Sequence, residues 1–252
     1  MNDLYDSTRQ GWSDMWDGAT VADELATMYY PRSQAIMQAC LPWLPRDAPV
    51  LEAGSGLGGP VIALRRAGHS NVIGMDYVES ALRAARRHTP GLTLFTGDIH
   101  AIPCADSTIG AYLSFGVLEH FEQGMGPALA EARRVLRAGG ILVLTIPYPS
   151  LVQRLVAGRQ RLLGKGPLVH ADFYERTYGR RELVANVVDA GFELCALRPT
   201  SHDYTLWSLG GPFRAPGYYR SSRLAETLGA ALARLLPWAF NYTTLIIARK
   251  PA

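Results

Sequence analysis

The sequence predicts an α/β fold in which helices cover both faces of a largely parallel sheet. Strand and helix patterns alternate from residue 50 to residue 147, which is the order that builds βαβ units. A glycine-rich turn, Gly54 to Gly59, lies between the first strand and the first helix of this region. Acidic residues stand at three successive strand ends: Glu52, Asp76 and Asp98. Because ligands of such sheets bind at the carboxyl ends of the strands, these residues mark the expected site.

The first 45 residues have a helical pattern rich in aromatic side chains, and Pro31 is placed to begin a helix over residues 31–44. These helices have two interpretations. The simpler one is that the aromatic side chains fill the edge of the core. In the other, they shield a reaction from water and contact a ligand. In the domain organisation that we predict, residues 1–44 form a helical N-terminal lid and residues 45–252 form the main domain.

The alternating region supplies five strands. They are predicted at residues 50–53, 72–76, 92–96, 109–115 and 141–146. The helices of this region are predicted at residues 58–67, 79–88 and 125–136, and Gly139-Gly140 ends the last of them.

The regular alternation stops after Pro147. Helices are predicted at residues 151–163, 180–191 and 222–236, and strands at residues 192–197 and 243–248. Long insertions between the strands of a compact domain are usually functional. We therefore predict that residues 148–176 and 199–242 form a cap over the carboxyl edge of the sheet.

The helix at residues 224–236 is apolar on much of its surface. Packing on the sheet is the default expectation for such a helix. Three alternatives stay open: the helix closes the pocket, binds a second subunit in a homodimer, or contacts a lipid-like substrate.

Composition excludes several classes of protein. Of 252 residues, 48% are apolar, so global disorder is not expected. The net charge of +3 is too small to indicate a nucleic-acid partner. The three cysteines lie far apart without metal-ligand spacing, which predicts a reducing, cytoplasmic location and no metal. We find no secretory signal and no apolar stretch long enough for a membrane span.

The glycine-rich turn fits G-x-G-x-x-G at Gly54, Gly56 and Gly59. Glycine permits a tight turn and lets a ligand approach the backbone, while the free N–H groups at a helix start receive electronegative atoms. Alone, this pattern is weak evidence for a ligand. The acidic strand ends strengthen it.

Each acidic residue suggests a contact. Asp76 is placed to accept hydrogen bonds from two ribose hydroxyls. Asp98 could recognise an amino-purine edge, and Glu52 could hold a cationic ligand or orient the turn. Together they predict a cofactor that carries a nucleoside.

At this point the sequence resembles the class I S-adenosylmethionine-dependent methyltransferases, in particular the small-molecule branch that includes quinone- and natural-product-modifying enzymes. The matching residues are 52–59, Asp76, 97–99, 114–121, 134–140 and the final strand at 243–250. The resemblance implies a Rossmann-like sheet of seven strands with the last strand antiparallel. It also implies S-adenosyl-L-methionine as the methyl donor and S-adenosyl-L-homocysteine as the product.

The resemblance assigns roles to individual residues. Gly54, Ser55 and Gly56 would line the methionine and ribose portion of the cofactor. Asp76 would bind the ribose hydroxyls and Tyr77 would pack near the adenine, which Asp98 and Ile99 would also contact. Ser114, Phe115 and Gly116 would lie beside the methionyl group. Glu52 departs from the aspartate that the family often has, and its longer side chain could change how the turn is held.

A general base is needed only if the methyl acceptor must lose a proton. The candidates are His120, His170 and His202. For His120 the alternative is a structural histidine in the turn after the fourth strand, and for the other two it is simple solvent exposure.

The substrate pocket is predicted from aromatic side chains of the N-terminal and cap segments. These are Tyr29, Tyr30, Tyr174, Tyr204 and Trp207. Packing between the cap and the sheet is the alternative role for them. A basic run at residues 154–165 is either a solvated helix face or a site for an anionic group of the substrate.

The sequence thus predicts a methyltransferase that acts on an oxygen or nitrogen of a small, apolar or aromatic molecule. One alternative is an NAD(P)-dependent oxidoreductase, which shares the glycine turn and the acid after the second strand. Another is a non-catalytic module that binds S-adenosylmethionine. A nucleic-acid methyltransferase is disfavoured because Ser-Phe-Gly-Val follows the fourth strand, where a base-holding Asn/Asp-Pro-Pro-Tyr/Phe motif is expected.

Overall fold

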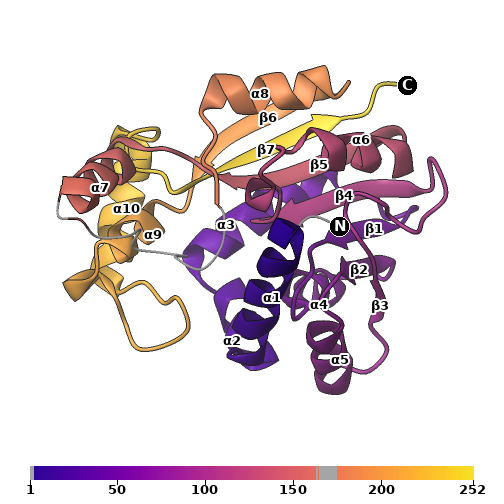
Figure 1. Cartoon of the computed structure of the whole chain (residues 1–252), viewed down its shortest axis with the longest axis horizontal. Helices are drawn as coiled ribbons and strands as arrows, with labels where there is room; N and C mark the ends of the chain where they lie inside the picture. The colour runs from indigo at the N-terminus through magenta and orange to yellow at the C-terminus, as the bar shows by residue number, and fades with distance from the viewer. Residues whose placement is uncertain (1–2, 163, 165–174) are drawn as a thin grey trace.

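Seven strands form a single mixed sheet in the order β3-β2-β1-β4-β5-β7-β6 (Figure 1). The computed structural model describes residues 3–162, 164 and 175–252. Strands β1 to β5 pair in parallel, and β7 runs antiparallel to both of its neighbours. The predicted seven-stranded fold with an antiparallel last strand is therefore confirmed.

The strands are β1 (Val50–Ala53), β2 (Val72–Asp76), β3 (Thr93–Thr96), β4 (Ile109–Phe115), β5 (Leu136–Pro147), β6 (Glu193–Thr200) and β7 (Thr243–Arg249). The α-helices are α1 (Asp3–Asp17), α2 (Val21–Met28), α3 (Pro31–Cys40), α4 (Gly59–Arg66), α5 (Glu79–His88), α6 (Gly126–Val135), α7 (Leu151–Leu162), α8 (Arg180–Asp189), α9 (His202–Ser208) and α10 (Arg223–Leu235). Short 3₁₀ turns are η1 (Leu41–Trp43), η2 (Leu118–His120) and η3 (Gly211–Phe213).

Each face of the sheet carries its own buried core. On one face, residues of α2, α3, α4 and α5 pack on β1 and β2, and Leu64 and Leu82 are buried there. On the other face, α6 and α8 cover β4 and β5, and Leu129 and Leu183 are completely buried. Because both faces are covered, the central strands β1 and β4 and the second half of β5 are almost continuously buried, as expected for the middle of a parallel sheet.

The N-terminal helices form for local reasons. Thr20 caps α2: its hydroxyl accepts a hydrogen bond from the Asp23 N–H, and Asp23 accepts one from the Thr20 N–H in return. Pro31 occupies the first turn of α3, as the sequence predicts. These caps fix where α2 begins and where α3 follows it, which sets the position of the side chains discussed below.

The predicted start of the fifth strand is wrong. Helix α6 ends at Val135, and β5 begins directly at Leu136, which pairs with Ile109. Regular pairing with β4 resumes only at Ile141, because residues 137–140 form an irregularity. Gly139 and Gly140 do not end a helix there. They exchange hydrogen bonds with Lys250 at the end of β7, and Gly139 has a φ of +71°.

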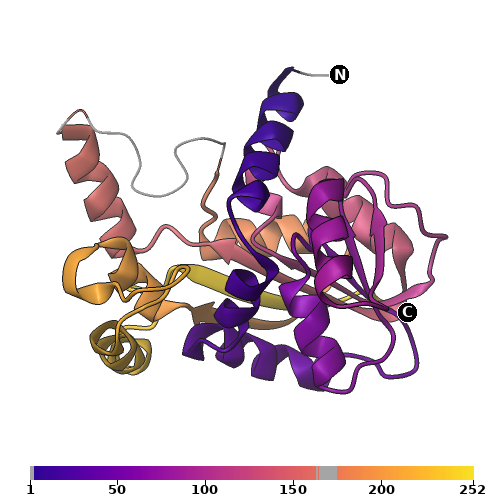
Figure 2. The ribbon, with the colours of Figure 1, turned by 90° about the horizontal axis from the view of Figure 1, so that it is seen from below.

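The two insertions leave the sheet at the same edge. One follows Pro147 at the carboxyl end of β5, and the other joins Thr200 at the end of β6 to Thr243 at the start of β7. Figures 1 and 2 show α7, α9 and α10 together beyond this end of the sheet. In the part of the chain that the structure describes, none of the helices combines the length and apolarity needed to cross a bilayer.

Helix α10 does not pack on the sheet, contrary to the default expectation. It packs on α9, and Gly229 permits the close approach: a Cβ there would lie 2.6 Å from the Asp203 backbone nitrogen. Several leucines of α10 remain exposed, including Leu224, Leu228 and Leu235. The helix therefore lies in the 199–242 insertion and outside the central core.

Candidate active site

The glycine-rich turn follows the carboxyl end of β1 and contacts the neighbouring strand β2. The N–H groups of Gly54 and Ser55 both donate to the Met75 carbonyl, at 2.8 and 2.9 Å, which ties the turn to β2. Gly54 has a φ of +85°, and a Cβ on it would lie 2.4 Å from a Val117 methyl carbon. The turn can therefore lie against the segment after β4 only because this position is glycine.

Asp76 holds the turn from the end of β2. Its Oδ2 accepts a hydrogen bond from the Gly56 N–H and its Oδ1 accepts one from the Val78 N–H, each at 2.8 Å. The side chain is buried, and burial raises its pKa above the usual value despite these bonds. A carboxylate has further lone pairs, so Asp76 can still accept hydrogen bonds from a ligand.

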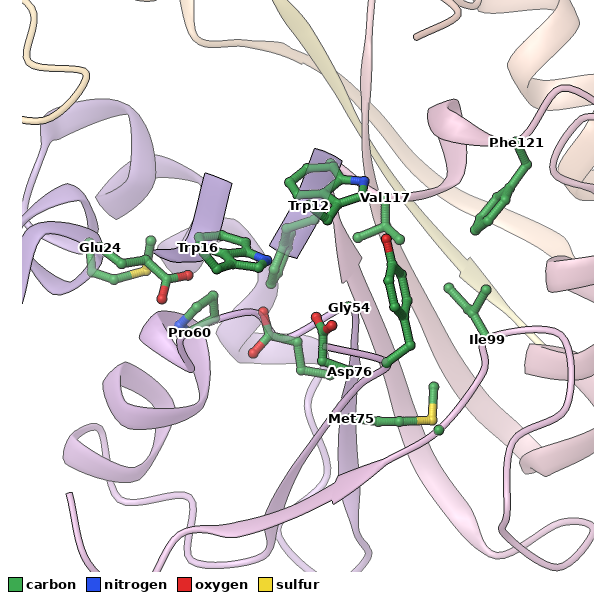
Figure 3. A pocket seen from close by; sticks show the side chains of 16 residues that line it. Trp12, Trp16, Glu24, Gly54, Pro60, Met75, Asp76, Ile99, Val117 and Phe121 are labelled. Carbon is green, nitrogen blue, oxygen red and sulfur yellow. The ribbon is translucent and has the colours of Figure 1, made fainter. Parts of the chain in front are cut away.

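A cavity of about 190 Å³ opens beside this turn, and we call it the loop cavity (Figure 3). Its lining includes seven of the residues assigned to the cofactor from the sequence: Glu52, Gly54, Asp76, Tyr77, Ile99, Phe115 and Gly116. Trp12 and Trp16 lie on the side of the cavity opposite Asp76 and Met75 (Figure 3). Helix α1 thus forms a wall that faces the strand ends.

Four assigned residues lie outside this lining. Ser55 is buried with its hydroxyl against Gly74, and the Ser114 hydroxyl donates to the Ala53 carbonyl at 3.0 Å. Gly56 is covered by the ring of Trp16. The Oδ1 of Asp98 accepts a hydrogen bond from the His100 N–H and lies 3.0 Å from the His100 ring Nδ1. These residues shape the turns around the cavity.

Glu24 of α2 brings a third carboxyl group to the loop cavity, beside those of Glu52 and Asp76. Its Oε2 accepts a hydrogen bond from the Gly59 N–H at 3.1 Å, at the start of α4. Burial raises the pKa of Glu24 to about 8, and the charge of Asp76 adds to the effect. Glu24 is therefore largely protonated at neutral pH when no cation is near.

Glu52 is the most deeply buried carboxyl group of this set, with 2% of its surface exposed. Its pKa lies well above the usual range, first because of burial and then because Glu24 and Asp76 are near. Its Oε2 has no hydrogen-bond partner among the described residues. An orphaned buried oxygen is costly, and a cationic ligand in the cavity would satisfy it.

A second cavity, of about 330 Å³, adjoins the first, and we call it the cap cavity. The two share Trp12, Trp16, Glu24 and Gly116 as lining residues. The other walls come from α3, the turn after β4, the end of β5 and the cap. They include Arg32, Glu119, His120, Glu175, Tyr204, Tyr218, Tyr219 and Tyr242.

The three candidate bases have different surroundings. His120 lines the cap cavity, lies edge-on to Trp12 with ring centroids 5.0 Å apart, and has its Nε2 4.0 Å from Glu119 Oε1. His202 is buried outside the lining, with its Nε2 2.8 Å from the Pro237 carbonyl, and burial lowers its pKa. His170 lies outside the described residues.

Only some of the aromatic residues assigned to the substrate pocket line the cap cavity or contact its walls. Tyr204 lines the cap cavity, and Trp207 stacks on it with ring centroids 4.7 Å apart. Tyr30 contacts a wall residue: its hydroxyl donates to the Tyr218 carbonyl at 3.0 Å. Tyr29 is 64% exposed, and its hydroxyl accepts a hydrogen bond from Arg66. Tyr174 lies outside the described residues.

Four wall residues carry no signal that sequence reasoning detected: Glu24, Arg32, Glu175 and Tyr242. Arg32 illustrates why. Its partner in a buried ion pair is Asp203, at 3.1 Å and 171 positions further along the chain. No local pattern indicates such a contact. The described residues contain no group of three or more His, Cys, Asp or Glu side chains arranged to hold a metal ion.

A comparison with known protein families matches the part of the chain that carries most residues of the loop cavity. Residues 51–144 match a family model described as a methyltransferase domain. This segment contains the glycine turn, Asp76 and the turn after β4. Residues 51–144 therefore form a methyltransferase domain of the kind found in class I S-adenosylmethionine-dependent methyltransferases. The cofactor of these methyltransferases is S-adenosylmethionine.

Individual relatives agree with this assignment. The chain is 28% identical over 177 residues to a probable S-adenosylmethionine-dependent methyltransferase of Mycobacterium tuberculosis. That match covers 69% of this chain and 59% of the relative. It is also 37% identical over 129 residues to a ubiquinone/menaquinone biosynthesis C-methyltransferase of Paracoccus denitrificans. That match covers 45% of this chain and 50% of the relative. The chain thus spans about half the length of the curated relatives that it matches.

The fold has a solved counterpart. One chain of the complex between the Trm112 methyltransferase activator of Haloferax volcanii and a methyltransferase superposes with a TM-score of 0.65. The match covers 95% of this chain and 98% of that chain, at 19% identity. It supports the architecture and not a particular substrate.

Proposed function

We propose that this methyltransferase transfers the methyl group of S-adenosylmethionine to a small organic acceptor, with the donor in the loop cavity. When bound, S-adenosylmethionine supplies a methyl group already activated on a positively charged sulfur. The observation that carries the proposal is the convergence of Glu24, Glu52 and Asp76 on a cavity beside a glycine turn. Buried carboxyl groups that lack a counter-charge suit a ligand that bears an ammonium and a sulfonium.

The residues that would hold the donor have distinct roles. Asp76 would accept hydrogen bonds from the ribose hydroxyls while it keeps its bonds to Gly56 and Val78. Glu52, with its orphaned Oε2, would face the positive end of the donor. Tyr77 and Ile99 would contact the adenine, and the bare backbone of Gly54 would leave room for the methionyl group.

The cap cavity would hold the acceptor. It shares a wall with the loop cavity at Trp12, Trp16, Glu24 and Gly116, so a methyl group can pass between ligands in the two cavities. Its volume of about 330 Å³ is compatible with a small organic molecule. We further propose that residues 1–44, whose Trp12 and Trp16 line both cavities, act as a lid, and that the insertions at about 148–176 and 199–242 form a cap.

The reaction needs little from the protein beyond geometry. Methyl transfer is an in-line displacement at carbon, and alignment of the reactants can supply on the order of 7–11 kcal/mol. The tryptophans would also exclude water from the reacting atoms. An oxygen or nitrogen acceptor is proposed here. If the acceptor is a hydroxyl group that must lose its proton, His120 is the histidine candidate in the cavity wall to remove it.

Isothermal calorimetry with S-adenosylhomocysteine tests the donor site. The Asp76→Asn variant should bind it at least about tenfold more weakly, a loss of about 1.4 kcal/mol. The matched control is Asp189→Asn, since Asp189 is exposed at the end of α8. Equal affinity in the Asp76→Asn protein, or equal binding of NAD⁺ by the unchanged protein, would contradict the proposal.

A further inference from the structure

The cap cavity is unusually acidic for a site expected to take an apolar molecule. Three carboxyl side chains line it, those of Glu24, Glu119 and Glu175. Glu119 is 2% exposed, and its Oε2 finds no hydrogen-bond partner within the described parts of the chain. A buried oxygen of this kind at a cavity wall calls for a donor that the ligand must bring.

Glu175 lies beside Glu119. The backbone N–H of Arg176 donates to the Glu119 carbonyl at 3.0 Å, so the segment that carries Glu175 crosses the turn after β4. The two carboxyl groups are close enough that the charge of Glu175 raises the pKa of Glu119. Burial alone raises the pKa of Glu175 to about 7. Two acids held together in this way favour a cation between them.

Tyrosine rings form the rest of this corner of the cavity. Tyr204 lies edge-on to Tyr242, with ring centroids 4.7 Å apart, and Tyr218 lies 4.5 Å from Tyr219. The face of an aromatic ring attracts cations, and clusters of such rings bind ammonium groups. The guanidinium of Arg32 already lies 4.8 Å above the Tyr204 ring, so a cation is compatible with this environment.

The positive charge of Arg32 does not neutralise these acids. Among the described lining residues, Arg32 is the only lysine or arginine. Its guanidinium is held by Asp203 at 3.1 Å, by the Ser221 hydroxyl at 3.2 Å and by the Tyr219 carbonyl at 2.5 Å. Its charge is therefore matched by Asp203, which does not line the cavity.

We propose that the acceptor is an amine, whose ammonium group is held between Glu119 and Glu175 against the rings of Tyr204 and Tyr242. This inference rests on the proposed methyl transfer and names its substrate class. The rest of the acceptor would extend toward Trp12, which lines both cavities. The same acids disfavour an anionic acceptor, and a neutral alcohol brings no positive charge for Glu119 and Glu175 to pair with.

The chemistry is balanced without a further reactant. An ammonium nitrogen has no free lone pair, so the bound group first gives a proton to the Glu175 carboxylate. The nitrogen lone pair then forms the bond to the methyl carbon, and the carbon–sulfur bond breaks with its electrons going to sulfur. The positive charge passes from sulfur to nitrogen. The titratable or charged groups of neighbouring elements that face this corner are Glu119, Tyr204, Tyr242 and Arg32: the charge of Glu175 acts on the first three, and Arg32 acts on Tyr204.

The test uses the full chain saturated with S-adenosylhomocysteine and two matched sets of compounds. One set is 2-phenylethylamine, 2-phenylethanol and 3-phenylpropionate, and the other carries the same three groups on an indole scaffold. By calorimetry, at least one amine should bind about tenfold or more tightly than its alcohol, with the carboxylate weakest. Glu175→Gln and Glu119→Gln should remove most of this preference. Glu122→Gln, at an exposed position, should keep it.

Two outcomes overturn the inference. One is that no amine binds more tightly than its alcohol. The other is that both variants keep the preference while they still bind S-adenosylhomocysteine. Binding of S-adenosylhomocysteine alone is measured first. If it is absent, the proposed function fails. If it is present without amine preference, only the substrate class fails.

Discussion

Glu24 and Gly59 are 35 positions apart in the sequence, yet the Gly59 N–H donates to Glu24 Oε2 at 3.1 Å. Gly59 begins α4, where unpaired backbone N–H groups are expected to receive an electronegative group of a ligand. In this structure an acidic side chain from the N-terminal region takes one of them. The N-terminal helices are thereby joined to the glycine turn.

The burial of Glu24 predicts a specific pH dependence, because it raises the pKa of this carboxyl group more than the hydrogen bond from Gly59 lowers it. The pKa of Glu24 is about 8 when folded and 4.5 otherwise, so the folded protein holds this proton longer. The resulting contribution to stability is fully present below the unfolded pKa and is lost as the pH rises through about 8. Glu24→Gln keeps the hydrogen bond without a titrating group. We expect its melting temperature to fall less than that of the unchanged protein between about pH 5 and pH 9.

Differential scanning fluorimetry of the ligand-free proteins across this range is the measurement. Glu122→Gln serves as the control, because Glu122 is exposed and its variant should follow the unchanged protein. If the Glu24→Gln curve runs parallel to the other two, the carboxyl group of Glu24 does not titrate as described.

Gly54→Ala should disable the donor site. The new Cβ would lie 2.4 Å from a Val117 methyl carbon, and the φ of +85° is strained for alanine. We expect a loss of about 1–3 kcal/mol of stability and binding of S-adenosylhomocysteine that is too weak to detect. Gly126→Ala is the matched control, because nothing lies within 4 Å of its Cβ position. A Gly54→Ala protein with normal affinity would show that the turn is free to move.

Arg32→Met should destabilise the cap through a charge left without its partner. Arg32 and Asp203 are 10% and 9% exposed, and breaking such a pair costs about 3–5 kcal/mol. Adding Asp203→Asn should recover part of this loss. Urea denaturation measures both changes. In the control Arg83→Met, an exposed pair with Glu79 is lost, which should cost no more than about 0.5 kcal/mol. Equal effects in the two single variants would argue against a buried pair.

Gly229→Ala tests the packing of α10 on α9. A Cβ at Gly229 would lie 2.6 Å from the Asp203 backbone nitrogen, so the two helices must separate, at a cost of about 1–3 kcal/mol. Gly158→Ala in α7 has open space around it and should be neutral or stabilising by up to about 1 kcal/mol. Thermal unfolding distinguishes the two. A stabilised Gly229→Ala protein would contradict the helix contact.

Local patterns accounted for most of the fold. The apolar runs at residues 50–53, 72–76 and 109–115 predict β1, β2 and β4 because buried parallel strands need continuous apolar sequence. The fifth strand was misplaced because Gly139 and Gly140 look like a helix stop in the sequence. Their conformation is decided instead by hydrogen bonds to Lys250, more than a hundred positions away.

The sequence by itself determined the sheet, the glycine turn and Asp76, since each depends on residues close together in the chain or on a period that repeats along it. Only the tertiary structure decided what lines the two cavities. Glu24, Arg32, Glu175 and Tyr242 come from separate segments, and burial and neighbouring charges give these side chains their properties. Such properties arise when distant segments pack together, so no local pattern encodes them.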